Sequence, residues 1–221
     1  MRGRKAAARF GIVLYDGVEP IDLGGTVGAL SMAKRIIPGI EHVVIAEKPG
    51  PVKLAGGLVV EAPCGFADAP ACDLIVVCGG PGWPEACQNP QLLAFLRASP
   101  PEQLASVCTG AMILAAAGVL DGRTATTRRA RVGIERRAPL SLLPDVAKDV
   151  KAVPAAIVDD VVVTGGGVSL AIDTTLYLIG KIYGIDARND VARIIEYDRA
   201  LKANLDALGS ITPDAFPQSR F

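Results

Sequence analysis

The chain alternates between short apolar runs and longer segments rich in alanine and leucine. The apolar runs contain many β-branched residues and few polar interruptions, which is typical of strands buried on both faces of a sheet. Strands are expected at 10–15, 42–46, 74–78, 104–107 and 123–127, and a strand pair at 157–164 with its hairpin turn at Asp159-Asp160. Helices are expected at 27–36, 91–98, 109–120, 168–183 and 189–208.

Alternating strands and helices predict an α/β fold, a doubly wound and mostly parallel sheet with helices on both faces, as in flavodoxin-like proteins. No internal repeat and no linker divides the 221 residues. One domain is therefore expected over 10–208, after a basic tail at 1–9 and before a loosely held, polar tail at 209–221. In such sheets ligands bind at the carboxyl ends of the strands, so the residues after each strand are the candidates for chemistry.

The composition narrows the class of partner. Half of the residues are hydrophobic, which suffices for a full core and excludes a disordered chain. The chain has 23 lysines plus arginines and 23 aspartates plus glutamates, so its formal net charge is zero. It therefore lacks the net positive charge that favours binding to nucleic acid. No apolar run approaches the roughly 20 residues of a membrane-spanning helix, and Arg9 interrupts the stretch that a secretory signal would keep apolar. We expect a cytoplasmic protein that binds a small molecule, not nucleic acid or a membrane.

The sequence gives little sign of a cofactor. His42 is the only histidine, so a multi-histidine metal site is excluded and no metal is expected. The five cysteines are an odd number without paired spacing, which argues against disulfide bonds. Neither the glycine run at 79–82 nor the one at 165–167 has the spacing of a dinucleotide-binding motif, and no Walker-type lysine is present.

Cys108 stands between a predicted strand and a predicted helix. That corner is the layout of a nucleophile elbow, in which the side chain sits on a tight turn at a helix start. A helix N-terminus stabilises a thiolate, so we expect a lowered pKa and a functional thiol at Cys108. For the other four cysteines, a buried structural role is expected instead.

Two carboxylates follow the first predicted strand. Asp22 lies in the loop that a doubly wound fold brings beside the other strand exits, where a carboxyl could exchange a proton with a thiol. A helix N-cap is an equally good reading of Asp22, and Glu19 competes for the acid–base role. Gly79 and Gly80 follow the third strand, where glycine lets the backbone approach a ligand closely.

Arg128 belongs to a basic cluster of six arginines between 123 and 137. A solvated surface is the favoured reading of such a cluster. An anion-binding site is the alternative, because arginine binds carboxylates and phosphates strongly.

These residues together resemble the ThiJ/PfpI superfamily, whose fold is class I glutamine amidotransferase-like, and within it the isonitrile hydratase group. The resemblance covers about 10–197 and is carried by YDGVEPIDLGG, CGGPGWPEA, SVCTGAMILAAAGVLDGR, VVVTGGGVSLAIDTTLYL and IIEYD. It implies that Cys108 is the nucleophile, that Asp22 is the acidic residue of the first loop, and that Thr109 assists. Gly79 and Gly80 then line the site with their backbone.

Two departures from the family pattern stand out. Arg128 occupies the place where relatives often carry histidine, which removes the partner used by proteolytic and deglycating members and places an arginine at or near the pocket. The first loop reads Asp22-Leu23-Gly24-Gly25 instead of the usual DLTGP.

The resemblance implies hydration of an isonitrile to an N-substituted formamide through a cysteine thioimidate, without a metal or organic cofactor, in a homodimer. Two alternatives remain open. One is a ligand-sensing domain like the sensor half of AraC-type regulators. The other is a cysteine hydrolase or glyoxalase-type enzyme, which Arg128 disfavours.

Overall fold

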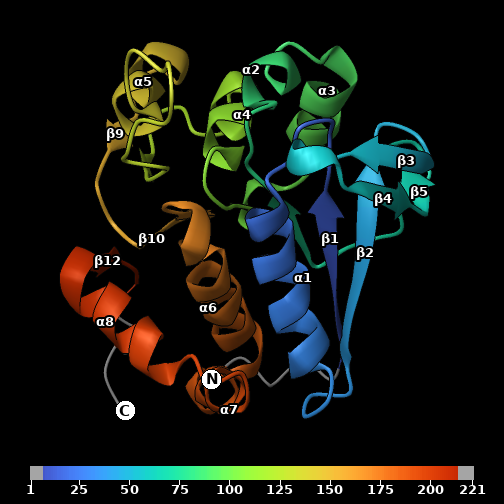
Figure 1. The fold of residues 1–221 in the computed structure, drawn as a ribbon, viewed down its shortest axis with the longest axis vertical. Helices are drawn as coiled ribbons and strands as arrows, with labels where there is room; N and C mark the ends of the chain where they lie inside the picture. Colours follow the sequence, from blue (N-terminus) through green and yellow to red (C-terminus); the bar gives the residue numbers. More distant parts are fainter. Residues whose placement is uncertain (1–6, 214–221) are drawn as a thin grey trace.

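The computed structural model describes residues 7–213 and contains an eight-stranded sheet in the order β12-β10-β11-β7-β6-β1-β2-β5 (Figure 1). All neighbouring strands run parallel except β10 and β11, which form an antiparallel hairpin. The predicted doubly wound α/β fold is therefore confirmed. The strands of this sheet are β1 (Ala8–Val13), β2 (Ile40–Ala46), β5 (Cys64–Gly65), β6 (Leu74–Val77), β7 (Leu104–Ser106), β10 (Ile157–Asp160), β11 (Val162–Gly165) and β12 (Ser210–Ile211).

Helices cover both faces of the sheet. One layer contains α1 (Pro20–Ala33), α6 (Ala171–Tyr183), α7 (Ile185–Ile194) and α8 (Asp198–Leu208), and the other contains α2 (Trp83–Ala86), α3 (Pro90–Ala98), α4 (Gly110–Ala116) and α5 (Pro139–Val146). Figure 1 shows α1 and α6 side by side in front of the sheet. Because strand side chains alternate, β1 contributes Phe10 and Ile12 to the core under the first layer and Val13 to the core under the second.

Helix α1 begins at Pro20, seven residues before the predicted start at Val27. Proline is favoured in the first turn of a helix because it needs no hydrogen-bond partner for its nitrogen. The glycines at 24, 25 and 28 lower the helix propensity of this segment, which conceals the helix in the sequence. In the fold, a Cβ at Gly25 would lie 3.1 Å from the Cβ of Ala171, so glycine allows α1 to pack closely on α6. Asp22 therefore lies in the first turn of a helix and not in a loop.

Other boundaries also differ from the prediction. The expected helix at 189–208 is two helices, α7 and α8, because the chain turns at Glu196, where φ is 54°. The hairpin turn is centred on Val161 (φ 64°), just after the predicted Asp159-Asp160. The strand expected at 123–127 is present as β8 (Thr124–Ala125), but its partner β9 (Lys151–Ala152) was not predicted. The sequence reading also missed the β3 (Gly50–Lys53) and β4 (Val59–Ala62) hairpin and helix α5.

The ends of the described chain are paired with the sheet. Ala8 and Arg9, assigned to the basic tail from the sequence, belong to β1. Ser210 and Ile211, at the start of the predicted C-terminal tail, form β12 beside β10, while 1–6 and 214–221 lie outside the described residues. Within 7–213, no helix has both the length and the apolar character needed to cross a bilayer.

Candidate functional site

Three neighbouring strands bring the predicted site residues together. β7, β6 and β1 are adjacent and parallel, so their carboxyl ends meet at one edge of the sheet. Cys108 follows β7, Gly79 and Gly80 follow β6, and Asp22 lies on α1 after β1. The topology of the sheet thereby brings Asp22 and Cys108 close together in space, although they are far apart in the sequence.

Cys108 occupies a strained turn between β7 and α4. Its φ is 50°, a left-handed conformation that residues other than glycine rarely adopt. The turn is also tightly packed, because a Cβ at Gly110 would lie 2.0 Å from the carbonyl oxygen of Val77. The residue is only 3% exposed. The geometry is that of a nucleophile elbow whose thiol is almost completely enclosed.

Asp22 is fully buried beside this turn. Its Oδ2 accepts a hydrogen bond from the backbone N–H of Gly79 (2.9 Å), and its Oδ1 has no partner in hydrogen-bond geometry among the described residues. Burial raises the pKa of Asp22 from 3.8 to about 7, against opposing effects of Gly79 N–H, the Cys108 thiol and the charge of Arg128. This carboxyl therefore exists in both protonation states near neutral pH, as a proton-exchanging group requires.

The prediction of a lowered pKa at Cys108 is wrong. Burial, followed by the charge of Asp22, raises the pKa of the Cys108 thiol to about 12. The N–H and hydroxyl of Thr109 at the helix start, together with the Arg128 charge, do lower it, but burial outweighs them. The thiol is thus neutral at pH 7, and the residue beside it able to take its proton is Asp22.

The glycine loop after β6 is held by Thr109. The Thr109 hydroxyl accepts a hydrogen bond from Gly80 N–H (2.9 Å) and lies 3.3 Å from the Gly80 carbonyl oxygen, to which it donates. A Cβ at Gly79 would lie 2.5 Å from the Thr109 nitrogen and 2.7 Å from Asp22 Oδ2. At Gly80, where φ is 150°, a Cβ would lie 2.3 Å from the Glu19 nitrogen. Only glycine fits at these two positions.

Glu19 forms its hydrogen bond to the site through its backbone, while its charge contributes to the raised pKa of Asp22. Its N–H donates to the carbonyl of Gly79 (2.9 Å), and it stands at the N-cap of α1 without a side-chain capping bond. Of the two candidate carboxylates, Asp22 is therefore the one placed against Gly79 and Cys108.

Arg128 is buried and paired, not part of a solvated surface. It is 9% exposed, and its guanidinium donates to both carboxylate oxygens of Glu135, with a distance of 3.0 Å from Nη1 to Oε2. Nη1 also donates to the carbonyl of Ala130. The charge of Arg128 lowers the pKa of Asp22 and of Cys108, so the arginine acts electrostatically on the site although Glu135 holds it.

Sequence reasoning missed three residues of this neighbourhood. Thr127 donates a hydrogen bond from its hydroxyl to the Cys108 carbonyl (2.7 Å) and so fixes the elbow from outside. Glu135 pairs with the guanidinium of Arg128. Tyr15 donates to the Cys78 carbonyl (3.0 Å), and its pKa is raised first by burial and then by neighbouring groups that include Asp22 and Cys108. A lone aromatic residue at a strand end carries no signal by which it could have been found.

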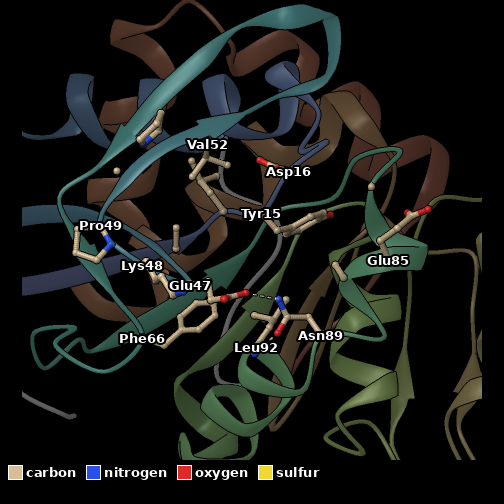
Figure 2. A pocket seen from close by; sticks show the side chains of 16 residues that line it. Tyr15, Asp16, Glu47, Lys48, Pro49, Val52, Phe66, Glu85, Asn89 and Leu92 are labelled. Atoms are coloured by element: carbon tan, nitrogen blue, oxygen red, sulfur yellow. Dashed lines mark hydrogen bonds between the residues drawn. The ribbon is translucent and has the colours of Figure 1, made fainter.

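A cavity of about 350 Å³ lies at the same edge of the sheet, beyond Tyr15 (Figure 2). Neither Cys108 nor Asp22 lines it. His42 lies in β2, two strands away from β6, and does not contribute to the site. Among residues 7–213, no three histidine, cysteine, aspartate or glutamate side chains converge in a way that would hold a metal ion.

Two known proteins with similar sequences differ in their named function. The chain is 30% identical over 218 residues to the isonitrile hydratase of Pseudomonas putida, which covers 96% of this chain and 86% of that protein. It is 28% identical over 195 residues to the HTH-type transcriptional regulator GbdR of Pseudomonas aeruginosa, of which it spans only half the length.

The fold comparison agrees with the sequence comparison. A crystal structure of a ThiJ/PfpI family protein from Pseudomonas syringae superimposes with a TM-score of 0.73 at 24% identity, over 87% of this chain and 76% of that one. The model of the DJ-1/PfpI family matches residues 8–181, a range that contains Asp22, Gly79, Cys108 and Arg128. This protein therefore belongs to the DJ-1/PfpI family, as its sequence motifs predicted.

Proposed function

We propose that this protein hydrates an isonitrile to an N-substituted formamide, with Cys108 as nucleophile and Asp22 as the acid–base group. The observation that carries the proposal is the buried pair itself, in which a strained, enclosed thiol lies beside a carboxyl whose pKa is raised to about 7. The 30% identity to an isonitrile hydratase supports the same substrate class. Thr109, Gly79 and Gly80 shape the backbone around the reacting atoms.

In the first step, the Asp22 carboxylate takes the proton of the Cys108 thiol. The sulfur then forms a bond to the isonitrile carbon, while Asp22 delivers the proton to that same carbon. The triple bond between the nitrogen and the terminal carbon of the isonitrile thereby becomes the C=N double bond of a thioimidate. No oxidant or reductant is consumed.

In the second step, water adds to the thioimidate carbon. Asp22 takes one proton from this water and delivers it to the nitrogen of the intermediate. The carbon–sulfur bond then breaks, the remaining hydroxyl proton passes through Asp22 to the Cys108 sulfur, and the formamide leaves with its new carbonyl group. A carboxyl that titrates near neutral pH serves both steps, because it must act first as base and then as acid. The proposed reaction uses no metal and no organic cofactor.

The enclosure of the thiol favours a second candidate function. Cys108 is only 3% exposed and its thiol is neutral, which fits a domain that senses a small molecule without transforming it. The similarity to half of a transcriptional regulator supports this alternative. The DNA-binding domain would then belong to another chain or segment. A cysteine hydrolase or glyoxalase-type activity is less favoured, because Arg128 replaces the histidine that such relatives use.

Incubation with an alkyl and an aryl isonitrile, followed by chromatographic detection of the formamide, tests the proposal. The wild type should form product, whereas Cys108→Ser and Asp22→Asn should not. Cys87→Ser is the matched control, since the Cys87 thiol bonds to the Met112 carbonyl and has no contact with Asp22. Binding of the isonitrile without formamide in the wild type would favour the sensor and contradict the enzyme.

We also propose a homodimer located in the cytoplasm. Exposed apolar side chains on α1 and on the β3–β4 hairpin support self-association, since Ile21 is 56%, Leu58 57% and Val59 61% exposed. The five cysteines are free, as in a reducing compartment. Light scattering coupled to size exclusion should give twice the chain mass, and Ile21→Lys should reduce it to one chain.

A further inference from the structure

The cavity beyond Tyr15 has the dimensions of a ligand site. It lies where β1 and β2 end, between the segment that leads into β3 and helices α2 and α3. Its volume of about 350 Å³ is within the roughly 300–1,000 Å³ of small-molecule sites. Figure 2 shows its lining with the Tyr15 ring in the middle and Phe66 on the opposite side from Glu85.

The charged groups of this cavity are mostly negative. Asp16, Glu47 and Glu85 face a single cation, Lys48, so the formal charge of the lining is −2. Asp16 accepts a hydrogen bond from the Lys53 N–H (3.0 Å), and Glu47 accepts one from the Asn89 amide (2.7 Å); neither bond neutralises a charge. The Glu85 side chain forms no ion pair or hydrogen bond within residues 7–213.

An aromatic and apolar surface adjoins the cavity beyond Tyr15, which we call the acidic chamber because of its three carboxylates. Phe66 stacks on Phe95 with 4.8 Å between ring centroids and an interplanar angle of 18°. Phe66 also borders a second, more open hollow of about 540 Å³, whose walls include Phe95, Ala67 and Ala98. Glu47, Lys48 and Phe66 line both spaces, so the acidic chamber and the apolar hollow adjoin each other.

We propose that these adjoining cavities bind an organic ammonium ion that carries an apolar aryl or alkyl group. The ammonium would lie among Asp16, Glu47 and Glu85, against the faces of Tyr15 and Phe66, where cations are attracted to aromatic rings. The apolar group would follow Phe66 toward Phe95. The site is distinct from the Cys108 pair, although Tyr15 connects the two through its bond to the Cys78 carbonyl, next to Gly79.

Calorimetric titration with three probes of similar shape tests this site. Benzylammonium should bind at pH 7, and more weakly as salt is added, whereas benzyl alcohol and benzoate should bind at least tenfold more weakly. Glu85→Gln should weaken benzylammonium binding about fivefold, the range of one partly exposed ion pair. Glu102→Gln removes an exposed carboxylate elsewhere and should change nothing.

Equal affinity for the three probes, or the same benzylammonium affinity in Glu85→Gln as in the wild type, would overturn the proposal. A Cys108→Ser variant shows where benzylammonium binds. Unchanged binding supports a site separate from Cys108, whereas lost binding assigns benzylammonium to the Cys108 turn and contradicts the proposal. Circular dichroism of each variant verifies the fold. Since the readout is binding, failure of isonitrile turnover would leave this result unaffected, and the two proposals fail independently.

Discussion

Glu135 holds the guanidinium of Arg128 through both of its carboxylate oxygens, seven residues along the chain and at the border of the Cys108 site. The pair holds the positive charge of Arg128 at a position where this charge lowers the pKa of Asp22 and of Cys108. Glu135 is the counterion of that charge. An arginine that is already neutralised in this way is poorly suited to bind an anionic substrate. Its position indicates an electrostatic role in place of the absent histidine.

Removal of this charge should raise the pKa of Asp22. Arg128→Gln takes away a cation that favours the ionised carboxyl, so the titration midpoint of Asp22 should move above the wild-type value of about 7. Carbon-13 NMR of the aspartate carboxyl groups measures this without any need for turnover. The double variant Arg128→Gln/Glu135→Gln, which leaves no unpaired carboxylate behind, should titrate at a similarly raised pH. A midpoint identical to the wild type would exclude Arg128 from the electrostatics of the site.

Asp22→Asn should abolish turnover. The amide preserves the shape of the side chain and can still accept the Gly79 N–H, but it cannot carry a proton. The expected loss is about 10²–10⁴-fold in rate. Formamide production by this variant at a wild-type rate would remove Asp22 from the proposed mechanism and return Glu19 to consideration.

The same substitution should stabilise the fold above neutral pH. Because the pKa of Asp22 is raised from 3.8 to about 7, its stabilising contribution is complete below pH 3.8 and is lost as the pH rises through 7. Above that pH the folded protein holds a buried charge, at a cost on the order of 4 kcal/mol. Urea unfolding at pH 8.5 should show a gain for Asp22→Asn that shrinks at pH 5. A gain of equal size at both pH values would contradict the raised pKa.

Asp22→Asn should also make Cys108 easier to alkylate. The Asp22 charge is one of the causes that raise the pKa of Cys108, so its removal should increase the thiolate fraction at a given pH. Mass spectrometry after brief treatment with iodoacetamide at pH 9 should find several times more label on Cys108 than in the wild type. Label on Cys87 should be the same in both proteins, since its pKa is raised by burial alone. Slower labelling of Cys108 would contradict this prediction and would mean that Asp22 withdraws the thiol proton even when no isonitrile is bound.

Gly79→Ala should disrupt the site, because its Cβ would lie 2.5 Å from the Thr109 nitrogen and 2.7 Å from Asp22 Oδ2. Both atoms belong to the proposed catalytic arrangement, so we expect loss of turnover together with a lower melting temperature. Gly28→Ala is the matched control: it is an exposed position on α1 with no atom within 4 Å of the added Cβ. That variant should be more stable by about 0.5–1 kcal/mol, as alanine is a better helix former. Equal melting temperatures for the two variants would argue against the close packing at Gly79.

The sequence by itself determined the features that depend on short stretches of chain. The mostly apolar runs of β6 and β7 predicted those strands to within one residue, because strands buried on both faces consist mainly of apolar residues. The change from strand to helix around Cys108 predicted the elbow, since the turn is made by consecutive residues. Helix α1 was placed too late, because Gly24, Gly25 and Gly28 lower its local helix propensity, although Gly25 allows close packing against α6.

Only the tertiary structure decided the electrostatic state of the site. The sequence predicted a thiolate from the helix start, but the enclosure of Cys108 by segments distant in the chain reverses the direction of its pKa. Likewise, Asp22 titrates near neutral pH because α1 buries it, and Arg128 is held by a glutamate that the loop brings back toward it. Burial and pairing are properties of how distant segments pack, and desolvation depends on all of those neighbours at once, so no local pattern of residues could specify them.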